Sequence, residues 1–217
     1  MTTDDILKII DGGESSTVEF KRKSPGPVKL AKEISALANT KGGYLFLGVD
    51  DNKKLYGIHS EKTEKNILET AAYFHIEPTI DLEILSFRLH KKEIVLAIVP
   101  NSEFKPHKVI IVDENNITKK RAYIRVGEKS IEASSEMARL MTYQNPISGK
   151  ELKLSISEHE KRLFNYLEKY ERVTVKEYCK LVNISKRRAE RSLVSLVRAG
   201  IIQIHNDSTY DYFTLVG

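Results

Sequence analysis

The sequence predicts an α/β domain over residues 1–144, a linker over residues 145–156, and a small helical domain that ends in a β-hairpin over residues 157–217. Two observations lead to this division. Before residue 144, short apolar or alternating segments typical of strands are interleaved with segments of helical periodicity. Asn145-Pro146-Ile147-Ser148-Gly149 then interrupts both patterns, and these turn-forming residues favour a connection between domains.

Alternating apolar and polar residues predict the strands of the first domain. Residues 14–23 form one such strand, with Val18 and Phe20 on one face and Glu19 and Lys21 on the other. Lys41-Gly42-Gly43 is expected to form a tight turn at positive φ between a helix and the next strand. The other expected elements are helices over residues 3–11, 28–39, 63–74 and 133–143, and strands over residues 44–49, 55–58, 82–89, 93–99, 109–112 and 120–126.

The chain beyond the linker follows a different pattern. Ser157 and Glu160 have the spacing of a capping box, in which each side chain bonds the backbone near the other at the start of a helix. Two further helices are expected over residues 175–182 and 186–199, and a hairpin over residues 201–205 and 210–215 with a turn at Asn206-Asp207-Ser208. Three helices followed by a two-stranded ribbon resemble a winged helix-turn-helix domain, whose recognition helix would be residues 186–199.

The composition is that of an ordinary globular protein. The 217 residues are 41% hydrophobic, and 35 basic against 30 acidic residues give a net charge of +5 and a pI of about 9.1. This balance permits nucleic-acid binding without requiring it. The single cysteine, Cys179, excludes an internal disulfide framework and a Cys-rich zinc site. No apolar run reaches the roughly 18 residues of a membrane span and the acidic start lacks signal-peptide features, so we expect a cytoplasmic protein without membrane contact.

Three carboxylates are the candidate catalytic and metal-binding residues. Two strands with acidic residues near their ends can gather Glu14, Glu19 and Asp50 at one sheet edge, where they would hold Mg²⁺ or Mn²⁺ against a phosphate. Lys21, on the same strand face as Glu19, would stabilise the developing negative charge. The alternative is structural: Glu14 caps a loop, Glu19 pairs with a surface lysine, and Asp50 starts a turn.

Two further groups of residues are candidates for binding nucleic acid. Tyr123 and Arg125 share a strand face, where the arginine would bind a phosphate and the tyrosine would stack on a base. Lys105 and His107 would join them from a nearby loop. A polar outer face with cross-strand pairing is the alternative. The densest basic cluster lies at the start of the expected recognition helix and comprises Lys186, Arg187, Arg188 and Arg191.

An ordered series of motifs resembles the Schlafen AlbA-type domain over roughly residues 10–143. The series comprises Glu14-Ser15, Glu19-Phe20-Lys21, Ala38-Asn39-Thr40, Gly42-Gly43, Gly48-Val49-Asp50, Lys105-Pro106-His107 and Tyr123-Ile124-Arg125-Val126-Gly127. The resemblance implies an α/β fold that binds DNA or RNA. In animal Schlafen proteins it also implies metal-dependent cleavage of structured RNA by two glutamates and one aspartate. Those residues match Glu14, Glu19 and Asp50, with Asp51 as the alternative third carboxylate.

These observations favour a nucleic-acid-binding protein that regulates transcription and contacts DNA through both the winged helix and the AlbA-like domain. The alternative is a metal-dependent endoribonuclease that acts on structured RNA with Mg²⁺ or Mn²⁺. A regulatory interaction module without nucleic-acid contact is the third hypothesis. Animal Schlafen proteins carry two such lobes in one chain, so a homodimer of this chain would rebuild a comparable basic groove and is the expected assembly.

Overall fold

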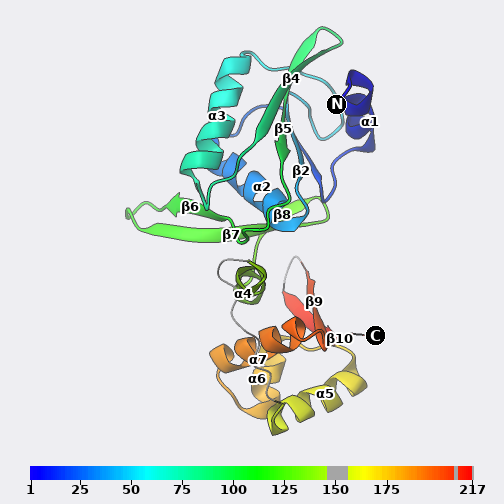
Figure 1. The fold of residues 1–217 in the computed structure, drawn as a ribbon, viewed down its shortest axis with the longest axis vertical. Coiled ribbons are helices and arrows are strands. Elements are labelled where there is room, and N and C mark those ends of the chain that lie inside the picture. The colour runs from blue at the N-terminus through cyan, green and yellow to red at the C-terminus, as the bar shows by residue number, and fades with distance from the viewer. Residues whose placement is uncertain (146–155, 208–209, 217) are drawn as a thin grey trace. The chain divides into compact units, whose positions relative to one another are not determined.

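The computed structural model describes residues 1–145, 156–207 and 210–216 (Figure 1). Contacts between residues divide the chain into a first unit, Met1–Ala133, and a second unit, Ser134–Gly217. Of the linker predicted over residues 145–156, residues 146–155 lie outside the described part of the chain. Within the described ranges, no helix has both the length and the apolar character that crossing a membrane requires.

The first unit contains two four-stranded sheets. One sheet has the order β1-β2-β5-β4, with β1 and β2 parallel and the other neighbours antiparallel. Its strands are β1 (Val18–Lys21), β2 (Gly43–Leu47), β4 (Glu83–Leu89) and β5 (Lys92–Val99). The other sheet has the order β3-β6-β7-β8 and is antiparallel. Its strands are β3 (Ile76–Glu77), β6 (Lys108–Val112), β7 (Thr118–Val126) and β8 (Lys129–Glu132).

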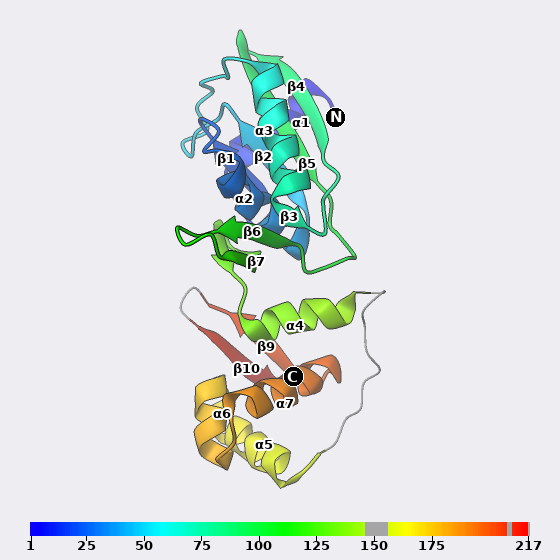
Figure 2. The same ribbon diagram turned by 90° about the vertical axis from the view of Figure 1, so that its left-hand side faces the viewer.

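Strict alternation along the strands of the first sheet separates two hydrophobic cores. Phe20 and Phe46 point to the face covered by α1 (Thr3–Gly12), where their rings pack edge to face against each other. Leu45 and Leu47 point to the opposite face, which α2 (Pro27–Thr40) and α3 (Glu61–Phe74) cover (Figure 2). Since α2 also contacts β6 and β7, it joins the two sheets. Glu19 and Lys21 therefore face α2, which confirms the predicted strand faces.

The turn before β2 has the predicted backbone. Gly42 and Gly43 have φ of 71° and 149°, and a Cβ on Gly43 would lie 2.1 Å from the Thr17 carbonyl oxygen. Only glycine allows that approach. Several expectations differ in detail. The strand predicted over residues 14–23 extends only over Val18–Lys21, and residues 55–58 form no strand beyond a single bridge between Val49 and Leu55. The sequence analysis predicted neither β3 nor β8.

The second unit consists of helices followed by an antiparallel hairpin. Its elements are α4 (Ser135–Gln144), α5 (Glu158–Tyr170), α6 (Val175–Val182), α7 (Lys186–Arg198), β9 (Ile202–Asn206) and β10 (Asp211–Leu215). The capping box of Ser157 and Glu160 is present, and Tyr178 and Phe213 lie fully buried in the core of the unit. The winged helix-turn-helix assignment of this arrangement stays a prediction.

Helix α4 belongs to the second unit, whereas the sequence analysis grouped it with the first domain. Arg139 on α4 forms an ion pair of 2.6 Å with Glu190 on α7, and the Ser135 hydroxyl donates to the same carboxylate. Glu190 is buried on the inner side of α7. A buried carboxylate requires a partner, and α4 supplies it.

Candidate functional site

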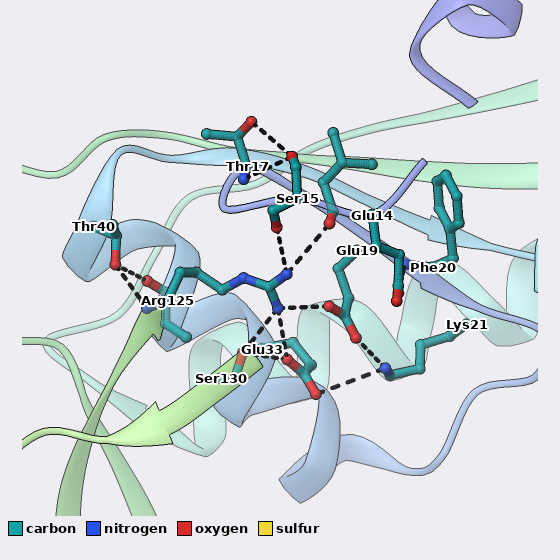
Figure 3. A network of polar contacts seen from close by, with 12 residues as sticks. Glu14, Ser15, Thr17, Glu19, Phe20, Lys21, Glu33, Thr40, Arg125 and Ser130 are labelled. Atoms are coloured by element: carbon teal, nitrogen blue, oxygen red, sulfur yellow. Dashed lines mark hydrogen bonds and ion pairs between the residues drawn. The ribbon is translucent and has the colours of Figure 1, made fainter. Parts of the chain in front are cut away.

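Arg125 on β7 is the centre of a largely buried polar network that includes two other predicted site residues, Glu19 and Lys21 (Figure 3). Its side chain has no exposed surface, and Nη1 lies 2.5 Å from Glu19 Oε2 on β1. Nη2 donates to the Ser15 carbonyl oxygen at 2.6 Å, and the Arg125 backbone N–H donates to Thr40 Oγ1 at 2.9 Å. Protein atoms therefore bind the guanidinium inside the fold, and the predicted contact between Arg125 and a phosphate stays a prediction.

Lys21 and Glu33 complete the network. Lys21 Nζ contacts the other oxygen of Glu19 directly and lies 3.7 Å from Glu33 Oε1 on α2. Glu33 Oε2 accepts a hydrogen bond from Ser130 and lies 3.5 Å from Arg125 Nη1. Burial disfavours the charge of Lys21, but the hydrogen bond and charge of Glu19 outweigh it and raise the pKa of Lys21. Two carboxylates and two cations thus neutralise one another.

Sequence reasoning missed Glu33, although a signal for it existed. Glu33 lies three residues after Leu30 and four before Leu37, on a helix face that is otherwise apolar. A carboxylate in that position requires a buried counter-charge. The sequence around Glu33 does not show which cation supplies this charge. Arg125 contacts both Glu19 and Glu33 in the folded chain, but it lies 106 residues from Glu19 in the sequence.

Glu14 and Asp50, the other two predicted carboxylates, bond backbone groups near them. Glu14 Oε1 accepts the Phe20 N–H at 2.9 Å. Asp50 Oδ1 accepts the N–H groups of Asn52 and Lys54, at 3.1 and 2.9 Å, as in a side-chain-capped turn. Burial raises the pKa of Glu14, and the charges of Glu19 and Asp51 add to that effect. Asp51, the alternative third carboxylate, thus lies near enough for its charge to act on Glu14, whereas Asp50 is not among the charges that do.

The residues present do not fit a divalent metal. Mg²⁺ or Mn²⁺ needs several carboxylate or carbonyl oxygens that face one cavity. Both oxygens of Glu19 face cations instead, and the described residues contain no group of three acidic, histidine or cysteine side chains arranged to hold a metal. The predicted ligand set of Glu14, Glu19 and Asp50 is therefore not assembled, because Arg125 occupies the position beside Glu19 with its own positive charge.

The raised pKa of Glu14 predicts the sign of a pH effect. Between its unfolded and folded pKa values the folded protein binds the extra proton, so the stability that this group contributes falls as pH rises through that range. Glu14→Gln keeps an oxygen that accepts the Phe20 N–H and removes the charge. We expect the variant to melt at a higher temperature than the wild type at about pH 7 and to lose this advantage near pH 4.

The matched control for this comparison is Glu83→Gln, which removes one charge from an exposed position on β4. It should not reproduce the pH-dependent difference. A Glu14→Gln variant less stable than the wild type at neutral pH would show that the ionised carboxylate is required. A melting temperature that Mn²⁺ raises in the wild type but not in the variant would identify Glu14 as a metal ligand.

The side chains of Lys105 and His107 form hydrogen bonds with other groups of the first unit. His107 is 3% exposed, with Nδ1 at 2.7 Å from the Pro78 carbonyl oxygen and Nε2 at 2.6 Å from Ser102 Oγ, and burial lowers the pKa of its imidazole. Lys105 Nζ donates to the Thr40 carbonyl oxygen and to Asn101 Oδ1, each at 2.8 Å. These contacts account for both polar side chains without a bound phosphate.

Tyr123 lies in the core between α2 and β7, with Lys32 over its ring at 5.5 Å from the centroid. Its side chain is 8% exposed, and the predicted stacking of a base on its ring stays a prediction. The Asn39 side chain links this strand to the segment of His107: it donates to the carbonyl oxygens of Tyr123 and His107, both at 2.9 Å, and accepts the His107 N–H at 2.8 Å. The sequence analysis assigned no site role to Asn39.

The predicted basic cluster at the start of α7 is exposed. Ser185 caps the helix, and Ala189, Leu193 and Leu196 bury its inner face. On the outer face, one cation forms a long ion pair of 3.7 Å, from Lys186 Nζ to Glu190 Oε1. The other three make no ion pair with any residue that the structure describes; they are Arg187, Arg188 and Arg191.

Two solved structures resemble the chain at low sequence identity. The crystal structure of the DIP2311 protein from Corynebacterium diphtheriae is 17% identical, with a TM-score of 0.43 over 66% of this chain and 27% of that chain. The solution NMR structure of the N-terminal domain of a RecG-related protein from Nitrosomonas europaea is 18% identical, with a TM-score of 0.44 over 73% of this chain and 97% of that chain.

The first unit matches the model of a known sequence family. The family described as Schlafen, AlbA_2 matches residues 14–134, a range that begins at Glu14, contains the whole Arg125 network and covers more than half of the 217 residues. This match confirms the resemblance that the motifs suggested. The chain belongs to the Schlafen AlbA_2 family.

Proposed function

We propose that the protein binds nucleic acid and regulates transcription, with α7 as the element that contacts DNA. The observation that carries the proposal is the exposed basic cluster at the N-terminus of α7, where three arginines lack a counter-ion among the described residues. Membership of the Schlafen AlbA_2 family supports nucleic-acid binding in general. The choice of α7 as the contact rests on its charge and exposure.

Helix stability does not account for this cluster. Positive charges in the first turn of a helix interact unfavourably with the helix dipole, and the first turn of α7 contains no acidic residue. A phosphate backbone would compensate these charges and release its own counter-ions. In a winged helix, α7 would be the recognition helix and the β9–β10 hairpin the wing, which is the arrangement we propose for the second unit.

We propose binding without cleavage. The nuclease alternative needs carboxylates available to a metal, whereas Glu19 is neutralised by Arg125 and Lys21. We also do not assign nucleic-acid contact to Lys105, His107 or Arg125, whose polar groups bond within the first unit. The same holds for Tyr123, which lies in the hydrophobic core.

Replacing Arg187, Arg188 and Arg191 together with alanine should weaken DNA binding and flatten its salt dependence. Each lost phosphate contact removes about 0.9 from the slope of log K against log salt concentration, so three contacts should change the slope by about 2.7. The measurement is fluorescence anisotropy with labelled duplex DNA and with structured RNA, over about 50 to 200 mM salt. Parallel titrations with Mn²⁺ and with EDTA should agree, since the proposed contact needs no metal.

The control removes the same charge from another exposed helix of the second unit, as Lys161→Ala, Arg162→Ala and Lys169→Ala on α5. It should leave the slope close to that of the wild type. An unchanged slope in a folded α7 variant, or equal losses in both variants, would reject α7 as the contact. Absence of any DNA or RNA binding in the wild type would favour the interaction-module hypothesis. Sedimentation velocity on the same samples tests the predicted homodimer.

A further inference from the structure

A second basic site lies in the first unit, in a pocket of about 540 Å³. The segment after β1, the loop after β2, helix α3 and the β4–β5 hairpin line it. Its cationic side chains are Arg22, Lys23, Lys91 and Lys92, and His59 and Tyr56 also line it. This volume falls within the range typical of small-molecule sites.

Backbone contacts hold the walls of this pocket together. The hairpin tip places His90 and Lys91 at φ of 44° and 64°, which is the geometry of a tight two-residue turn. The Ile58 N–H donates to the Glu93 carbonyl oxygen at 2.8 Å, and a Cβ on Gly57 would lie 3.3 Å from that same oxygen. The loop after β2 therefore lies directly against β5, and the lysines of the hairpin are presented at a defined place.

Arg22 is positioned without a carboxylate. Its guanidinium carbon lies 3.7 Å from the centroid of the Tyr56 ring, and Lys54 Nζ lies 5.2 Å from the same centroid. Stacking on an aromatic ring orients a guanidinium while leaving its N–H groups in the plane available for hydrogen bonds. No hydrogen bond or ion pair of the Arg22 side chain is present among the described residues. Such an arginine is suited to bidentate binding of an anion.

The charge of the pocket is not balanced by its own acidic residues. Glu64 and Glu93 also line it, against four permanent cations. None of those four cations forms an ion pair with a described residue. Burial raises the pKa of Glu64, against the opposing effect of His59. Concentrated positive charge in a concave site attracts an anion from solution.

We propose that this pocket binds a terminal phosphate group, at the end of a nucleic-acid strand or on a free mononucleotide. A phosphomonoester carries up to two negative charges and three acceptor oxygens, which suits several cations around one cavity. A concave pocket admits the end of a strand more readily than a continuous backbone. The strand-end source rests on the proposed nucleic-acid binding, whereas the mononucleotide source does not.

The test compares ligands that differ only in the phosphate. One single-stranded oligonucleotide is prepared with a 5′-phosphate, with a 3′-phosphate and with hydroxyls at both ends, and adenosine 5′-monophosphate is compared with adenosine. We expect the full chain to prefer the phosphorylated member of at least one pair by about tenfold, the effect of one charge-assisted hydrogen bond. An oligonucleotide preference alone identifies the strand end as the source, and a mononucleotide preference alone identifies the free nucleotide.

The variant Arg22→Ala with Lys91→Ala should abolish this preference, and Arg22→Lys should retain part of it because the charge remains. The control Lys8→Ala with Lys129→Ala removes two exposed charges outside the pocket and should retain the preference. The α7 triple variant should also retain it, even where duplex affinity is lost, so failure here and failure of the proposed function are distinguishable. Equal affinity for phosphorylated and unphosphorylated ligands in the wild type, or equal losses in the pocket variant and its control, would overturn the proposal.

Discussion

Replacing Arg125 with methionine should lower the free energy of unfolding of the first unit by about 3–5 kcal/mol. Methionine fills much of the same volume, so lost packing is a minor part of the effect. The larger part is the loss of the partner at 2.5 Å from Glu19, which is 4% exposed and would then have only Lys21 as a cation among the described residues. Removing one partner of a buried ion pair is among the few single changes with effects of this size. Urea unfolding followed by circular dichroism measures it.

A double-mutant cycle separates pairing from general damage. Glu19→Gln alone should also destabilise, because Arg125 and Lys21 then keep only Glu33. The double variant, Glu19→Gln with Arg125→Met, removes both charges and should lose less stability than the two single losses added together. Additive losses would contradict the role of Arg125 as the counter-charge of Glu19, and so would an Arg125→Met variant of wild-type stability.

Replacing Gly43 with alanine should cost more than about 3 kcal/mol. Two penalties coincide at this residue. Its φ of 149° is unfavourable for any residue with a Cβ, and the Cβ would lie 2.1 Å from the Thr17 carbonyl oxygen. That carbonyl accepts the Tyr44 N–H at 2.8 Å, so relieving the clash breaks the first bond between β1 and β2. Thermal unfolding of the purified variant gives the loss, and insolubility on expression would agree with it.

Alanine substitutions at two other glycines are the controls for the stability loss of Gly43→Ala. Gly127 has φ of 59° but no atom within 4 Å of a Cβ, so Gly127→Ala carries the backbone penalty alone, about 1–2 kcal/mol. Gly12 has neither constraint and lies in α1, where alanine is the better helix former, so Gly12→Ala should be neutral or stabilising. A Gly43→Ala variant no less stable than Gly127→Ala would mean that β1 and β2 can separate at low cost.

Local features of the fold were predictable because their causes lie within a few residues. The alternation of Val18 and Phe20 with Glu19 and Lys21 fixes which side chains share a face, and Gly42-Gly43 requires a turn. The capping box at Ser157 gives the start of α5. The pattern predicts which side chains share a strand face, but it does not predict which element or side chain lies across from that face.

The candidate site was less predictable because its key contact joins distant segments. The sequence shows that Glu19 is a carboxylate on a strand, on the face opposite Val18 and Phe20, and that observation fits both a metal ligand and an ion-paired residue. Arg125 decides between them from 106 residues away. Helix α4 presents the same difficulty, since its periodicity predicts a helix but not which core it joins. The ion pair between Arg139 and Glu190 supplies that information.

The hydrogen bonds of Asn39 and Thr40 bear on how relatives of this chain should be compared. The Asn39 side chain forms hydrogen bonds with backbone groups of His107 and Tyr123, 68 and 84 residues further along the chain. Thr40 Oγ1 accepts a hydrogen bond from the backbone N–H of Arg125, 85 residues further along. Both belong to the motifs by which the family resemblance was recognised, as do Glu19 and Arg125. That signature therefore marks a shared architecture, and two proteins that carry it in full can still differ in chemistry.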